Sequence, residues 1–259
     1  MNDQIEPEKA ERATKRGIYL LPNLLTTLGL FSGFYAIVAA MRGDFDLAAI
    51  AVYIAMIMDG LDGRVARLTN TQSAFGVEYD SLADIVSFGI APSLVAYQWG
   101  LVEIGKPGWL VAFFYAAATA LRLARFNVKV VDSKPSKYFQ GLPCPAAAGL
   151  VAGMIWVAHE YGVPGKTLWD LAAIVTLITA SLMVSTVKYY SFKDIDLKGK
   201  VPFVVILAAV ILLLFISIDP PKVLMSSFAL YVISGPAYCA WRWLKSRKAK
   251  RSRMKKTDL

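Results

Sequence analysis

The chain has 259 residues, of which 56% are hydrophobic and 18% are charged, and its mean hydropathy is +0.49. A soluble domain is about 45–50% apolar and about 25% charged, so this composition excludes an ordinary soluble fold. In a membrane protein, basic loops that face anionic membrane lipid explain the net charge of +9, and no nucleic-acid partner is expected.

Apolar segments recur along the chain at the length of a membrane-spanning helix, which is about 20 residues. Eight spans are predicted, at 18–40, 46–67, 77–98, 108–128, 144–162, 168–187, 201–218 and 223–242. The first segment is too long for the apolar core of a cleaved signal peptide and is interpreted as a retained span. The predicted fold is therefore all-α, a polytopic transmembrane helix bundle. It divides into a tail at 1–17, a catalytic membrane domain at 18–244 and a basic tail at 245–259.

Lysine and arginine residues are distributed unevenly between the loops. They gather before the first span, after the second, fourth and sixth spans, and in the C-terminal tail. Loops rich in lysine and arginine stay in the cytoplasm, so both termini are predicted to be cytoplasmic and the number of spans to be even. We expect a multi-pass protein of the cell membrane.

Four aspartates interrupt the apolar pattern of the second and third spans. Asp59 and Asp62 follow a wholly apolar run, and Asp80 and Asp84 precede a mostly apolar one. A carboxylate at the bilayer centre costs about 2.5–3.5 kcal/mol on the insertion scale. These acids must therefore be neutralised by protonation, by arginine or by a divalent cation.

Helix geometry predicts that the four carboxylates meet. At about 100° per residue, Asp59 and Asp62 share one helix face, as do Asp80 and Asp84 on the next helix. The short loop at 68–75 makes the two helices antiparallel neighbours. Oxygen ligands from facing helices suit Mg²⁺, Mn²⁺ or Ca²⁺, and four carboxylates can hold two ions for phosphoryl chemistry. Asp84 could also accept a proton from an attacking hydroxyl.

The acidic cluster is also compatible with a structural role or with transport. The aspartates could form a structural ion-pair network with nearby arginines, namely Arg64, Arg67, Arg122 and Arg125. They could instead line the cation or proton pathway of a transporter.

The spacing of these residues resembles a known signature. The run Asp59-Gly-Leu-Asp62-Gly63-x-x-Ala66-Arg67, eight residues, then Gly76-x-x-x-Asp80-x-x-x-Asp84 is similar to the complete signature of the CDP-alcohol phosphotransferases. The sequence around it resembles one subgroup, the membrane-embedded phosphatidylserine synthases. That similarity covers Pro22-Asn23 and the segments 80–92, 122–127 and 139–148.

The resemblance implies an enzyme that transfers the phosphatidyl group of a CDP-activated lipid to the hydroxyl of L-serine and releases CMP. The lipid would be CDP-diacylglycerol or an ether-linked analogue. Two divalent cations, Mg²⁺ or Mn²⁺, are implied as cofactors, with the active site facing the cytoplasm. A homodimer is implied as well, with six core spans and the last two spans outside that core.

The resemblance also implies roles for individual residues. The metal ligands would be Asp59, Asp62, Asp80 and Asp84, and Asp84 would also be the catalytic general base. The nucleotide would be bound at Asp62, Gly63, Ala66, Arg67 and Gly76.

The acceptor site is predicted from polar residues near the cytoplasmic opening of this active site, namely Arg122, Arg125, Asn127 and Gln140. A guanidinium binds a carboxylate or a phosphate equally well through its planar fork. Serine therefore follows from the family resemblance, whereas electrostatics alone also allows glycerol 3-phosphate or inositol phosphate. Ordinary cytoplasmic positive charge would account for these arginines equally well.

Overall fold

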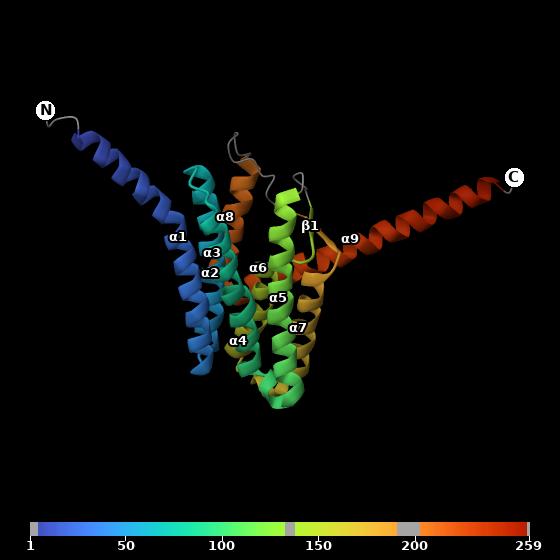
Figure 1. The fold of residues 1–259 in the computed structure, drawn as a ribbon. Coiled ribbons are helices and arrows are strands. Elements are labelled where there is room, and N and C mark those ends of the chain that lie inside the picture. Colours follow the sequence, from blue (N-terminus) through green and yellow to red (C-terminus); the bar gives the residue numbers. More distant parts are fainter. Residues whose placement is uncertain (1–4, 133–137, 191–202, 258–259) are drawn as a thin grey trace.

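The computed structural model describes residues 5–132, 138–190 and 203–257, which are almost entirely helical. Long helices lie side by side in a bundle, and α1 and α9 project beyond it in opposite directions (Figure 1). The elements are α1 (Ile5–Met41), α2 (Phe45–Leu68), α3 (Ala74–Asp84), η1 (Ile85–Ile90), α4 (Ala91–Trp99), η2 (Leu101–Ile104), α5 (Lys106–Asp132), β1 (Tyr138–Gln140), α6 (Cys144–Glu160), η3 (Gly165–Thr167), α7 (Trp169–Val184), β2 (Lys188–Tyr190), α8 (Phe203–Ile218) and α9 (Pro220–Thr257).

The helices confirm the predicted helical class and a membrane protein. Within the described residues, three helices are long and apolar enough to cross a membrane: Leu20–Met41, Lys106–Val128 and Pro220–Arg242. The helix Trp169–Val184 is also apolar but shorter. The count of eight spans and the cytoplasmic position of both termini stay predictions.

The first two helices form a tight antiparallel hairpin. Gly43 turns the chain with a positive φ of 83°, a conformation that glycine adopts without a steric penalty. The facing surfaces are built from small side chains, among them the fully buried Ala36 on α1 and Ala48 on α2. Small residues let two membrane helices approach closely, so α1 and α2 pack along most of their shared length.

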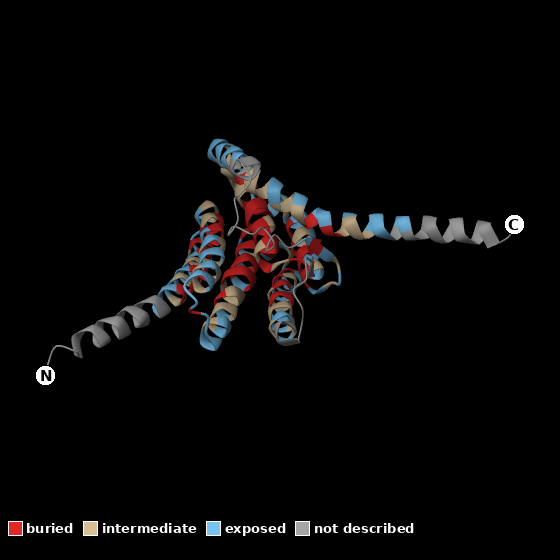
Figure 2. Cartoon of the chain, turned by 90° about the horizontal axis from the view of Figure 1, so that it is seen from above, coloured by how far each residue is buried: buried red, intermediate tan, exposed pale blue. Residues whose placement is uncertain are grey.

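Helix α6 lies at the centre of the bundle, and 11 of its 17 residues are buried (Figure 2). A Cβ at Gly149 would lie 2.7 Å from Cδ2 of Phe228 on α9. At the same residue, the backbone carbonyl accepts a hydrogen bond of 2.8 Å from the hydroxyl of Tyr53 on α2. Helices α2 and α9 therefore pack directly against the backbone of α6.

One continuous rod contains α3, η1 and α4, where the sequence predicts a single span at 77–98. The middle of this rod is a π-helix over residues 85–90, a distortion that sequence periodicity does not predict. There the hydroxyl of Ser87 donates to the Gly29 carbonyl of α1 at 3.1 Å. On the other side, a Cβ at Gly89 would lie 3.1 Å from Cβ of Thr119 on α5. The π-helix is thus held tightly between α1 and α5.

A short two-stranded ladder joins the segments that follow α5 and α7. Strands β1 and β2 are antiparallel, with Gln140 opposite Lys188. The fully buried Tyr189 donates a hydrogen bond of 3.0 Å to the Val232 carbonyl of α9, and burial raises the pKa of Tyr189 to about 12. The all-α prediction missed this ladder, which fixes the position of Gln140 near one end of the bundle.

Candidate active site

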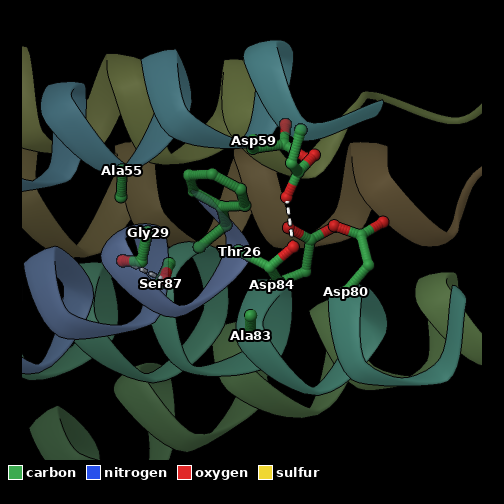
Figure 3. Close-up of a pocket in the computed structure, with 10 residues that line it drawn as sticks. Thr26, Gly29, Ala55, Asp59, Asp80, Ala83, Asp84 and Ser87 are labelled. Carbon is green, nitrogen blue, oxygen red and sulfur yellow. Dashed lines mark hydrogen bonds between the residues drawn. The ribbon is translucent and has the colours of Figure 1, made fainter. Parts of the chain in front are cut away.

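A pocket lies where α1, α2 and the α3–η1 rod meet. Figure 3 shows the carboxylates of Asp59, Asp80 and Asp84 pointing toward one another across it, with Thr26 reaching in from α1. The ten residues that line the pocket are Thr26, Gly29, Ala55, Asp59, Asp62, Asp80, Ala83, Asp84, Ser87 and Phe88. The structure therefore brings all four predicted aspartates into one site.

The turn between α2 and α3 sets the two acidic helices face to face. Asn70 adopts a positive φ of 53°, which asparagine tolerates better than most residues. Ser73 then caps α3, because its hydroxyl accepts a hydrogen bond of 3.0 Å from the Gly76 amide. The chain reverses within a few residues, so α3 runs back along α2 and carries its aspartates past Asp59 and Asp62.

The geometry of three carboxylates fits a divalent cation. One oxygen each from Asp59, Asp62 and Asp80 lie within 4.8 Å of one another. Hard oxygen ligands in such a cluster suit Mg²⁺ or Mn²⁺ better than zinc. Asp84 is outside this group of three, but it lies within electrostatic range of all of them. A cation held by these three carboxylates would therefore lie near the carboxylate of Asp84.

A structural ion-pair network finds little support in these contacts. Within the described part of the chain, no ion pair joins Asp62, Asp80 or Asp84 to an arginine. Arg67 and Arg122 lie close enough to influence the cluster electrostatically, but neither forms a salt bridge with those three residues. Carboxylates that are shielded from water and have no direct ion pair favour another source of neutralisation.

The predicted nucleotide residues lie on α2 and α3, close in sequence to the aspartates of the pocket. Gly63 and Ala66 are half-buried on α2, and Arg67 is exposed one helical turn after Gly63. A Cβ at Gly63 would lie 3.6 Å from a guanidinium nitrogen of Arg67. Gly76 lies near the first turn of the apolar part of α1, since its Cβ would be 3.4 Å from Oδ1 of Asn23. Asp62 alone of these residues lines the pocket itself.

The predicted acceptor residues do not line the pocket. Arg122 lies nearest, because it interacts electrostatically with Asp84, and its guanidinium donates to the sulfur of Cys144 at 3.4 Å. The Nε atom of Arg122 is buried and has no hydrogen-bond partner among the described residues. Arg122 therefore has an unused, buried hydrogen-bond donor and acts electrostatically on the acidic cluster.

The remaining acceptor candidates have different surroundings. Arg125 donates to the Val184 carbonyl of α7 at 3.4 Å, and the Asn127 amide donates to the Ser81 hydroxyl of α3 at 3.0 Å. Gln140 is exposed on β1. Arg125 and Asn127 thus connect α5 to α7 and to α3, and neither they nor Gln140 line the pocket.

Helix α1 contributes two pocket residues that received no individual role from the sequence. Thr26 and Gly29 lie three positions apart and are both buried. With Gly33 they form a stripe of small residues on one face of an otherwise bulky apolar helix. That stripe is the signal that could have indicated a close contact between α1 and the acidic helices.

Comparison with known proteins agrees with the sequence signature. Residues 19–185 match the family CDP-alcohol phosphatidyltransferase. A CDP-diacylglycerol–serine O-phosphatidyltransferase of Helicobacter pylori (strain ATCC 700392 / 26695) is 39% identical over 228 residues, which is 88% of this chain and 92% of that protein.

Proteins of the same name from more distant organisms are also similar. The one from Methanocaldococcus jannaschii is 34% identical over 179 residues, covering 69% of this chain and 78% of that protein. The one from Saccharomyces cerevisiae is 43% identical over 153 residues, covering 54% of this chain and 55% of that protein.

Proposed function

The chain belongs to the CDP-alcohol phosphatidyltransferase family, and we propose that it transfers the phosphatidyl group of CDP-diacylglycerol to L-serine. The observation that carries the proposal is the convergence of Asp59, Asp62, Asp80 and Asp84, the four acidic signature positions, on one pocket. The names of the relatives supply the acceptor, serine. Membership of an enzyme family also argues against the transporter interpretation of the aspartates.

The donor set fits divalent cations as cofactors. Asp59, Asp62 and Asp80 would hold the metal, and Asp84 would complete the site. When bound, such cations neutralise the diphosphate, favour deprotonation of the attacking hydroxyl and stabilise the leaving oxygen. The protein positions four carboxylates, from two antiparallel helices, around a single small pocket.

Asp84 is proposed as the general base of the reaction. Its carboxylate takes the proton of the serine hydroxyl as that oxygen forms a bond to the phosphorus nearest the lipid. The bond from this phosphorus to the bridging oxygen breaks, and CMP leaves with the electron pair. The pocket lining includes no cysteine and only Thr26 and Ser87 as hydroxyl residues, whose protons are donated to protein oxygens. Direct displacement is therefore favoured over an enzyme-bound intermediate.

The remaining signature residues are proposed to bind the nucleotide. Gly63, Ala66 and Gly76 would leave room for cytidine and its phosphates, and Arg67 would contact the phosphates. Arg122 is proposed to bind the carboxylate of serine, because its Nε atom is buried without a hydrogen-bond partner among the described residues. Asp84 would then lie between the donor and acceptor sites.

We propose that the pocket opens to the cytoplasm, where serine is available. The uneven distribution of basic residues supports this orientation. The family match ends at residue 185, which supports a six-span catalytic core with α8 and α9 outside it. The tails at 1–17 and 245–259, contact with anionic lipid and assembly as a homodimer stay predictions.

The test is CMP release by the purified full-length protein in detergent. CDP-diacylglycerol and Mn²⁺ or Mg²⁺ are supplied with serine, glycerol 3-phosphate or inositol phosphate in separate reactions. We expect release with serine, its loss with chelator, and a decrease of at least about 100-fold in Asp84→Asn.

The matched control is Asp46→Asn, which removes a carboxylate from the opposite end of α2. Asp46 pairs with Nδ1 of His159 at 2.8 Å and is absent from the pocket lining. This variant should keep its CMP release. Release with another acceptor alone would replace serine in the proposal, and equal activity in both variants would contradict the role of Asp84.

A further inference from the structure

Thr26 makes a contact that distinguishes it from neighbouring helical threonines. Its hydroxyl lies 2.6 Å from Oδ2 of Asp62 and 3.1 Å from the carbonyl of Pro22 one turn earlier. A hydroxyl has one proton, and a carboxylate is a stronger acceptor than a backbone carbonyl. The shorter distance therefore identifies the hydrogen bond to Asp62 as the dominant one.

Threonines in helices usually donate to the carbonyl four residues before them, which is a local interaction without functional meaning. Thr27 and Thr119 follow this pattern at 2.7 Å and 3.0 Å, and their partners on other helices, Tyr79 and Met183, are uncharged. In Thr26 the corresponding distance is longer, and the hydroxyl turns instead to a residue 36 positions away. The contact is thus directed across the helix interface toward the acidic cluster.

Both partners of this hydrogen bond are shielded from water. Thr26 is 5% exposed and Asp62 is 4% exposed, whereas Asp59 and Asp80 are only half-buried. Water can orient an exposed carboxylate, but a buried one depends on protein donors for its orientation. The hydroxyl of Thr26 holds Oδ2 of Asp62 and so limits rotation of the whole carboxylate group within the pocket.

We propose that Thr26 is a positioning residue, which orients Asp62 so that its carboxylate faces the divalent cation. The inference rests on the metal-dependent reaction proposed above and adds a residue of α1 to the aspartates, which lie on α2 and α3. Hydrogen-bond partners of metal ligands typically contribute about 10–100-fold to metal affinity. Loss of the hydroxyl should therefore weaken metal binding while the carboxylate ligands all remain.

The experiment measures Mn²⁺ binding to the purified full-length protein in detergent, from the electron paramagnetic resonance signal of free Mn²⁺. Thr26→Val removes the hydroxyl and keeps the shape of the side chain, and we expect its Kd for Mn²⁺ to rise at least about tenfold. Thr26→Ser keeps the hydroxyl and should stay within about twofold of the wild type. Excess Mn²⁺ should restore CMP release by Thr26→Val, because its ligands are intact.

The adjacent residue offers a matched control. The hydroxyl of Thr27 lies 2.9 Å from the phenol oxygen of Tyr79, so it also joins α1 to α3 but touches no carboxylate. Thr27→Val should bind Mn²⁺ like the wild type. If Thr26→Val does not fold, Thr26→Ala replaces it, with the melting curve as the criterion of folding.

Two results would overturn the proposal. One is wild-type Mn²⁺ affinity in folded Thr26→Val or Thr26→Ala, and the other is an equal loss of affinity in Thr26→Ser, which would implicate packing of the methyl group. A failure of the proposed reaction would give a different result. A wild-type protein that binds Mn²⁺ but releases no CMP would contradict the reaction and not the role of Thr26 in metal binding.

Discussion

Replacement of Gly33 by alanine tests how closely α1 must approach the π-helix. A Cβ at Gly33 would lie 2.5 Å from Oγ of Ser87 and 2.6 Å from its Cα. The hydroxyl can rotate away, but the Cα belongs to the main chain and can move only with η1. Either α1 or η1 must therefore shift, and Ser87 follows Asp84 by about one turn of the same rod.

Gly29, one turn earlier on α1, provides the matched comparison. Its Cβ would lie 3.5 Å from Cβ of Met58 and 3.7 Å from the carbonyl of Ala55, which are ordinary van der Waals distances. Alanine favours a helix over glycine by about 1 kcal/mol at either position, so this contribution cancels between the two variants. The remaining difference between the two variants is overpacking at Gly33, which lowers the free energy of unfolding by about 1–3 kcal/mol.

The measurement is the melting temperature of each variant in the same detergent, followed by tryptophan fluorescence. A difference of about 2 kcal/mol corresponds to about 4–8 °C for a chain of this size. We expect Gly33→Ala to melt that far below Gly29→Ala, and Gly29→Ala to melt at or above the wild type. Equal melting temperatures for the two variants would refute the close contact between α1 and η1.

Three further predictions concern packing and the metal. Tyr53→Phe removes the hydrogen bond of 2.8 Å to the Gly149 carbonyl and should cost about 1 kcal/mol, measured as a lower melting temperature; an unchanged value would contradict the contact. Gly165→Ala should prevent accumulation of folded protein on size-exclusion chromatography, because its Cβ would lie 1.7 Å from the Trp99 carbonyl. A monodisperse Gly165→Ala protein would rule out that approach. Asp80→Asn should weaken Mn²⁺ binding by at least about tenfold, and unchanged affinity would exclude Asp80 as a ligand.

The acidic cluster was predictable because it depends on local geometry. The spacing of Asp59 and Asp62, and of Asp80 and Asp84, places each pair on one helix face. The short connection between α2 and α3 then determines that these faces meet. No contact with a distant part of the chain is needed, and the structure brings the four residues together as expected.

Features that depend on distant contacts were not predictable in the same way. The π-helix is packed against Gly33 on α1 and Thr119 on α5, and neither contact leaves a periodic signal in residues 85–90. Strands β1 and β2 are three residues each, too short to show alternation. The acceptor residues are predicted from their type and position along the chain, which do not indicate the contacts of Arg125 with α7 and of Asn127 with α3.

The residues of the pocket are synthesised early, and this affects how the protein assembles. Every pocket residue lies between Thr26 and Phe88, whereas the hydrogen bond from α2 to α6 joins residues that are 96 positions apart. The acidic helices therefore leave the ribosome well before the helix that covers the other face of α2. All the residues that bring the four carboxylates together are thus synthesised before most of the bundle. If they meet at that stage, their charge must be neutralised during insertion, before any substrate can bind.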